Sequence, residues 1–111
     1  MAKVWIEAAL NGPWTRAKQP GIPVAVEEIV TDGIACAEAG AAIIHAHAYD
    51  VTTGRQKDDW EIYARIIEGI RDKVDVIVYP TIPSPGLGQD QNTNRFGHTL
   101  ELAKRGLIEW A

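Results

Sequence analysis

Short apolar runs with strand character alternate along this chain with segments whose apolar residues repeat at helical spacing. The strands are predicted to begin near residues 4, 42, 75 and 107, so each strand starts 32 to 38 residues after the previous one. The helices between them are predicted at residues 27–39, 58–74 and 99–105, the last with a possible start near Asn94. This order predicts parallel strands joined by right-handed crossover helices, which places the chain in the α/β class.

A (β/α)₈ TIM barrel, which needs roughly 250 residues, is the architecture that best fits this βα rhythm. Residues 1–111 are then the N-terminal part of a single TIM-barrel domain, with about the first three βα units and the opening of a fourth strand. A small open sheet is the alternative. A partial barrel leaves two unpaired sheet edges, which favours assembly, and we expect a homo-oligomer.

Turn-forming residues separate these elements. Loops are predicted at residues 14–23, after the second strand through Thr53-Gly54-Arg55, and at the proline-rich residues 80–88. Asp58 with Glu61 three residues later predicts a capping box at the start of the second helix. Small residues in the first helix, Gly33 among them, predict close packing of that helix on the sheet.

The overall composition excludes several kinds of partner. The net charge is −4 and no run of lysine and arginine occurs, so nucleic acid and anionic membrane surfaces are poor partners. The one cysteine, Cys36, cannot form an internal disulfide and fits a reducing compartment. Because no signal peptide or membrane-spanning apolar run is present, a cytoplasmic location is expected.

Two histidines, His45 and His47, end the second predicted strand. Strand side chains alternate between faces, so both rings point the same way, separated by roughly 7 Å of backbone. Two imidazoles can then bind one zinc ion at about 2.0–2.1 Å each. Ordinary buried histidines are the alternative, but an almost wholly apolar strand has no packing reason to carry two polar rings on one face. We therefore predict a metal site at this pair.

Several other polar residues have both a functional and a structural interpretation. Glu7 either faces solvent on an edge strand or turns inward near the metal. Asp50 either orients a histidine or starts the next loop through an Asx turn. His98, beside the third helix, is interpreted as exposed or helix-capping. Arg16 and Lys18 either contact an anionic substrate or lie in a solvated loop.

Several motifs, taken together and in order, resemble the start of the β-keto acid cleavage enzymes. They are Ala8-Ala9-Leu10-Asn11-Gly12, Pro20-Gly21-Ile22-Pro23-Val24, Glu27-Glu28-Ile29, Glu38-Ala39-Gly40-Ala41-Ala42-Ile43-Ile44-His45-Ala46-His47 and Thr53-Gly54-Arg55. The resemblance extends over the whole chain and over the first third of a typical family member. It implies a zinc-dependent TIM barrel that condenses a β-keto acid with acetyl-CoA and releases acetoacetate and a new acyl-CoA.

The same resemblance implies roles for particular residues. His45 and His47 match the metal ligands, and Thr81, at the end of the third strand, matches a residue that contacts substrate and intermediate. Asn11 and Trp14 are the other residues expected to bind substrate. The family's third metal ligand, a carboxylate, and its Arg–Asp pair for proton transfer have no matching positions here. We therefore expect the 111 residues alone to be inactive.

The predicted metal site, Thr81 and Trp14 suit this activity chemically. A zinc ion with an open position acts as a Lewis acid, and the Thr81 hydroxyl could donate to a developing oxyanion, although it could also only cap the strand end. A member acting on an amino-substituted keto acid has a glutamate where this chain has Trp14, so a neutral or apolar acyl tail is expected. A metal-dependent hydrolase of amidohydrolase type and a non-catalytic α/β module remain the alternatives.

Overall fold

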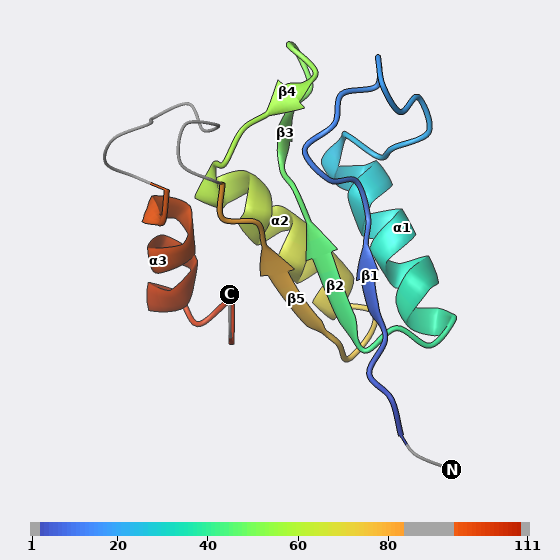
Figure 1. The fold of residues 1–111 in the computed structure, drawn as a ribbon. Coiled ribbons are helices and arrows are strands. Elements are labelled where there is room, and N and C mark those ends of the chain that lie inside the picture. Colours follow the sequence, from blue (N-terminus) through green and yellow to red (C-terminus); the bar gives the residue numbers. More distant parts are fainter. Residues whose placement is uncertain (1–2, 84–94, 110–111) are drawn as a thin grey trace.

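The computed structural model describes residues 3–83 and 95–109. Three helices and five short strands alternate within these residues (Figure 1). In chain order they are β1 (Glu7–Ala9), α1 (Val26–Glu38), β2 (Ile43–Ala46), β3 (Tyr49–Asp50), β4 (Arg55–Gln56), α2 (Trp60–Arg71), β5 (Ile77–Pro80) and α3 (Gly97–Lys104).

The strands β1, β2 and β5 form one parallel sheet with β2 in the middle. His45 in β2 pairs with Ala9 in β1 on one side and with Tyr79 in β5 on the other. Helix α1 joins β1 to β2, and α2 precedes β5, so consecutive strands of the sheet are connected through helices. The predicted α/β class is therefore confirmed as an open α/β unit, while closure into a TIM barrel stays a prediction.

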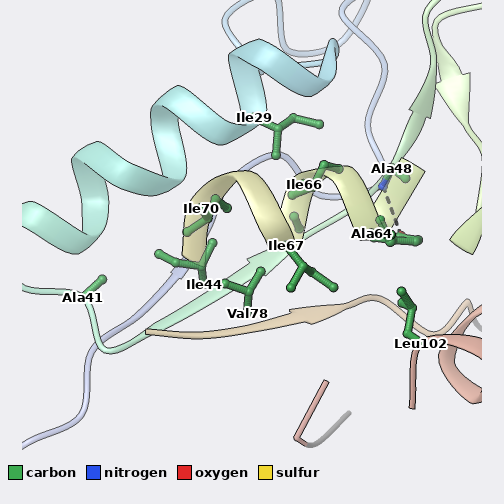
Figure 2. Close-up of a cluster of buried hydrophobic side chains, with 12 residues drawn as sticks. Ile29, Ala41, Ile44, Ala48, Ala64, Ile66, Ile67, Ile70, Val78 and Leu102 are labelled. Carbon is green, nitrogen blue, oxygen red and sulfur yellow. Dashed lines mark hydrogen bonds between the residues drawn. The ribbon is translucent and has the colours of Figure 1, made fainter. Parts of the chain in front are cut away.

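The hydrophobic core lies between the sheet and the helices α1 and α2, which cover one face of it (Figures 1 and 2). Ile44 and Val78 reach the core from the sheet, and α2 presents buried residues three or four positions apart. Those residues are Tyr63, Ala64, Ile66, Ile67 and Ile70. This spacing places them on one side of the helix, which explains why α2 packs against the sheet.

The opposite face of the sheet carries polar side chains. Because neighbours along a strand point to opposite sides, His45 and Tyr79 lie on the face away from Ile44 and Val78. Glu7 shares this face, since the hydroxyl of Tyr79 donates a hydrogen bond to its carboxylate. This polar face carries His45, one of the two predicted metal ligands.

The predicted polar loop after the second strand is a small hairpin. β3 and β4 pair in an antiparallel manner, with Tyr49 opposite Gln56. Gly54 has a φ of 72°, which glycine adopts without strain, and it allows the chain to reverse there. Asp50 forms the expected Asx turn, since its carboxylate accepts hydrogen bonds from the backbone N–H groups of Thr52 and Thr53 at 2.8 and 3.3 Å.

The predicted N-cap residue of α2, Asp58, is wrong by one position. Asp59, with extended φ and ψ of −102° and 122°, precedes the helix and accepts a hydrogen bond from the Glu61 N–H at 2.8 Å. Asp58 instead accepts hydrogen bonds from the side chains of Gln56 and Tyr63. Its carboxylate therefore binds side chains of the hairpin and of α2, and Asp59 takes the N-cap position.

Two predicted strands also differ from the structure. The ladder of β1 begins only at Glu7, although a strand from Val4 was predicted. Residues 107–109 are not a strand, because the Leu107 N–H donates to the carbonyl of Leu102 and closes the end of α3. Residues 84–88 of the predicted proline-rich loop and residues 110–111 lie outside the described residues. None of the described helices is both long and apolar enough to cross a membrane.

Candidate metal and substrate site

The two predicted metal ligands lie together at the carboxyl end of β2. The ring centroids of His45 and His47 are 5.1 Å apart, and the rings meet edge to face at 81°. His47 is 8% exposed, and His45 is half-buried beside the Tyr79 ring at 4.5 Å. The rings are thus neither splayed apart nor enclosed by aliphatic side chains, and their separation is compatible with a shared metal ion.

The surroundings of both imidazoles favour the neutral form. Burial lowers the pKa of His45, and the neighbouring His47 lowers it further, while Glu7 acts in the opposite direction. Burial also lowers the pKa of His47, against the opposing effects of Gln56 and Asp58. A neutral imidazole has a free lone pair, so the lowered pKa values favour the form that binds metal.

Asn11 fixes the backbone of His47 from the end of β1. Its side-chain amide donates to the His47 carbonyl at 2.8 Å, and its side-chain oxygen accepts from the His47 N–H at 2.9 Å. The same amide donates to the Pro23 carbonyl at 3.2 Å, and Asn11 is 5% exposed. The observed hydrogen bonds give Asn11 a positioning role, and a direct contact with substrate stays a prediction.

The His45 ring has an unsatisfied buried atom. Its Nδ1 is buried and has no hydrogen-bond partner among the described residues. A buried ring nitrogen left in this state is costly unless it has a partner, and a metal ion is one such partner. The pair therefore fits a metal ion by the chemistry of its donors. No group of three or more His, Cys, Asp or Glu side chains that could hold a metal occurs within residues 3–83 and 95–109.

A cavity of about 380 Å³ brings three predicted site residues together. Trp14, His47 and Thr81 line it, and the other lining residues are Gln56, Pro13, Ile82 and Pro83. His45 and Asn11 do not line this cavity. Most of the remaining lining residues are apolar. The cavity therefore combines the polar side chains of His47 and Thr81 with apolar surface suited to an acyl group.

The backbone of Thr81 is held from two sides. Its N–H donates to the carbonyl of Ala46 at 3.2 Å, and its carbonyl lies 2.7 Å from Nε2 of His98. His98 is 5% exposed and stacks on the Tyr63 ring, so the expectation that it would be exposed is wrong. Burial is tolerated because the imidazole ring stacks on Tyr63 and its Nε2 is bonded to the Thr81 carbonyl.

Several residues that contact the site were missed from the sequence. Gln56 Oε1 lies 2.9 Å from Nδ1 of His47, and Gln56 Nε2 donates to the Asp58 carboxylate at 3.1 Å. Tyr49 is 2% exposed, and its hydroxyl, which has one hydrogen to donate, lies within hydrogen-bond distance of the carbonyl oxygens of Gly12 and Trp14, the latter at 2.6 Å. The hairpin brings Gln56 and Tyr49 to the site, and only the turn at Gly54 signals it in the sequence.

The chain is similar to known proteins of one family. Residues 3–107 match the family model of the beta-keto acid cleavage enzymes. The chain is 39% identical over 83 residues to the 3-keto-5-aminohexanoate cleavage enzyme of Fusobacterium nucleatum, covering 73% of this chain and 30% of that protein.

Two further relatives carry acetyl-CoA transferase names. The 3-dehydrocarnitine:acetyl-CoA trimethylamine transferase of Rhizobium meliloti is 32% identical over 91% of this chain and 38% of its own length. The 3,5-dioxohexanoate:acetyl-CoA acetone transferase of Paraburkholderia graminis is 32% identical over 68% of this chain and 25% of its own length. The chain thus spans about a third of the curated relatives that it matches. It belongs to the β-keto acid cleavage enzyme family.

Proposed function

We propose that this chain forms part of the active site of a zinc-dependent enzyme that condenses a β-keto acid with acetyl-CoA, giving acetoacetate and an acyl-CoA. The observation that carries the proposal is the placement of His47 and Thr81 on one cavity, with His45 5.1 Å from His47. Family membership and the acetyl-CoA transferase names of the relatives support acyl transfer over the amidohydrolase alternative.

The proposed ligands are His45 and His47, and a third ligand from elsewhere completes the metal site. A zinc ion held there supplies Lewis-acid polarisation of a carbonyl oxygen. The Thr81 hydroxyl donates a hydrogen bond to the oxygen on which negative charge develops during cleavage of the carbon–carbon bond. The two hydrogen bonds to the Thr81 backbone hold this hydroxyl at the cavity wall.

We also propose a neutral or apolar acyl tail for the keto acid. Trp14 lies on the cavity wall with Pro13, Ile82 and Pro83, and an indole ring offers apolar contact area. No carboxylate belongs to the described lining of this cavity, so no negative charge there pairs with a substrate ammonium group. A homo-oligomer and a cytoplasmic location remain part of the proposal.

The test is an acyl-transfer assay on the protein as its organism makes it, with a panel of β-keto acids. We expect acyl-CoA and acetoacetate to form only when acetyl-CoA is added. Thr81→Val should lower kcat about a hundredfold or more through the lost hydrogen bond, whereas Thr31→Val on the exposed side of α1 should not. Turnover by hydrolysis without acetyl-CoA contradicts the proposal. So does vigorous turnover by the 111 residues alone.

A further inference from the structure

We propose that Gln56 and Asp58 are positioning residues that fix the tautomer of His47, with hydrogen on Nδ1 and a free lone pair on Nε2. The inference rests on the proposed function in one respect, since it makes Nε2 the ligand atom of His47. The tautomer itself follows from the direction of a chain of hydrogen bonds. That chain runs from the end of β2 through the hairpin to the first turns of α2.

The direction of the chain is set at Tyr63. Its hydroxyl oxygen accepts a hydrogen bond from the Ala48 N–H at 3.0 Å, and it lies 2.9 Å from Oδ1 of Asp58. A phenol has a single hydrogen to donate. Since the backbone N–H is already the donor at one contact, this hydrogen goes to Asp58. The carboxylate of Asp58 is therefore an acceptor in its contact with Tyr63.

The Asp58 carboxylate next fixes the orientation of the Gln56 amide. Both of its oxygens lie 3.1 Å from one end of that amide. An ionised carboxylate only accepts hydrogen bonds, so the NH₂ group of Gln56 must be the end that faces Asp58. The carbonyl oxygen of Gln56 then faces His47. A flipped amide would place two acceptors against each other at Asp58 and is excluded by this network.

The Gln56 oxygen fixes the hydrogen on His47. It lies 2.9 Å from Nδ1 of the imidazole, and an amide oxygen can only accept. Nδ1 must therefore carry the hydrogen. A neutral imidazole has one ring hydrogen, so with this hydrogen on Nδ1 the Nε2 atom keeps its lone pair.

The backbone holds this chain in place independently of any ligand. Gln56 lies opposite Tyr49 in the hairpin, and the Lys57 N–H donates to the Ala48 carbonyl at 2.9 Å. Asn11 fixes the His47 backbone from the other side. The ring of His47 is thus oriented before a metal binds, which reduces the ordering cost of binding.

The experiment is ¹⁵N NMR of the histidine rings in the metal-free 111-residue chain at neutral pH. We expect His47 to show hydrogen on Nδ1, and Gln56→Met to shift it toward a mixture of tautomers. Gln56→Glu combined with Asp58→Asn should keep hydrogen on Nδ1, because a carboxylate oxygen still accepts there and the introduced amide can donate to the other carboxylate oxygen. Gln19→Met, in an exposed loop, should leave the His47 spectrum unchanged. His98, which donates from Nε2 to the Thr81 carbonyl, reports that the fold is intact.

Zinc titration separates this inference from the proposed function. Gln56→Met and Asp58→Leu should weaken zinc binding by about 10- to 100-fold, the usual effect of losing such a partner, and Gln19→Met should not. Hydrogen on Nε2 in the unmodified chain, or zinc binding unaltered in Gln56→Met, overturns the inference. Absence of zinc binding in the protein as its organism makes it, which includes the third ligand, contradicts the proposed function, while the NMR result on the metal-free chain still decides the tautomer.

Discussion

At the scale of single residues, the site depends on His47 more than on any other side chain. Asn11 holds its backbone, Gln56 holds its ring, and the cavity opens beside it. His45 is held less completely, since its Nδ1 is buried without a partner among the described residues. The two rings are therefore closely spaced, but His47 is more firmly oriented than His45.

The lowered pKa values of the two histidines predict a loss of stability in acid. Both groups titrate lower in the folded chain than their usual value of about 6.5. At pH values between the folded and the unfolded pKa of each histidine, the unfolded chain binds more protons than the folded chain. The free energy of unfolding therefore falls as the pH drops below about 6.5. Urea unfolding of the metal-free chain at a series of pH values measures this. A variant with His45→Gln and His47→Gln should show a flatter dependence, and an equal slope in both proteins contradicts the prediction.

At the scale of elements, α1 and α2 approach each other closely through small residues. A Cβ added to Gly33 in α1 would lie 2.5 Å from Cδ1 of Ile70 and 3.0 Å from its Cγ1. The sequence predicted close packing of this helix on the sheet, but the nearest neighbour of Gly33 is a side chain of α2. Leu10, which follows β1, is farther away at 3.6 Å.

A larger side chain at Gly33 should therefore destabilise the fold. Gly33→Val inserts three carbons into the contact with Ile70 and should lower the free energy of unfolding by about 1–3 kcal/mol. Gly21→Val is the control, since Gly21 is exposed and has no atom within 4 Å of an added Cβ. It should change stability by less than about 0.5 kcal/mol. Chemical denaturation measures both, and equal unfolding midpoints would show that the helices do not pack as described.

The elements also show how far the sequence predicts this molecule. The bounds of α1, α2, β2 and β5 were predicted within a few residues. Each of these elements buries apolar side chains in the core, and the spacing of those residues in the sequence reveals the element. The prediction that the His45 and His47 rings lie near each other followed from the alternation of side chains along a strand. The hairpin could not be predicted, because its strands have two residues each and too little periodicity. The contacts of Gln56 and His98 were missed because they depend on how distant elements pack.

At the scale of the whole molecule, the sheet is covered on one face only within the described residues (Figure 1). β1 pairs only with β2 in this part of the chain, and β5 only with β2. Just before β1, three apolar side chains are strongly exposed: Val4 at 77%, Trp5 at 73% and Ile6 at 53%. An open edge next to exposed apolar residues favours association with further protein surface.

The 111 residues should therefore self-associate in solution. Sedimentation velocity at micromolar concentration should show species larger than a monomer. Trp5→Ser combined with Ile6→Ser should shift the distribution toward monomer, because it removes the exposed apolar surface beside the β1 edge. Leu100→Ser is the control, as it removes an exposed apolar residue from α3. A monomeric chain at every concentration contradicts this prediction.

Zinc binding tests the central claim, that His45 and His47 form a metal site, most directly. Equilibrium dialysis followed by elemental analysis should find zinc bound stoichiometrically to the unmodified protein and lost from both His45→Ala and His47→Ala. His98→Phe, which keeps an aromatic ring beside Tyr63, should retain the metal. Undiminished zinc in the two alanine variants, or none in the unmodified protein, would contradict the account.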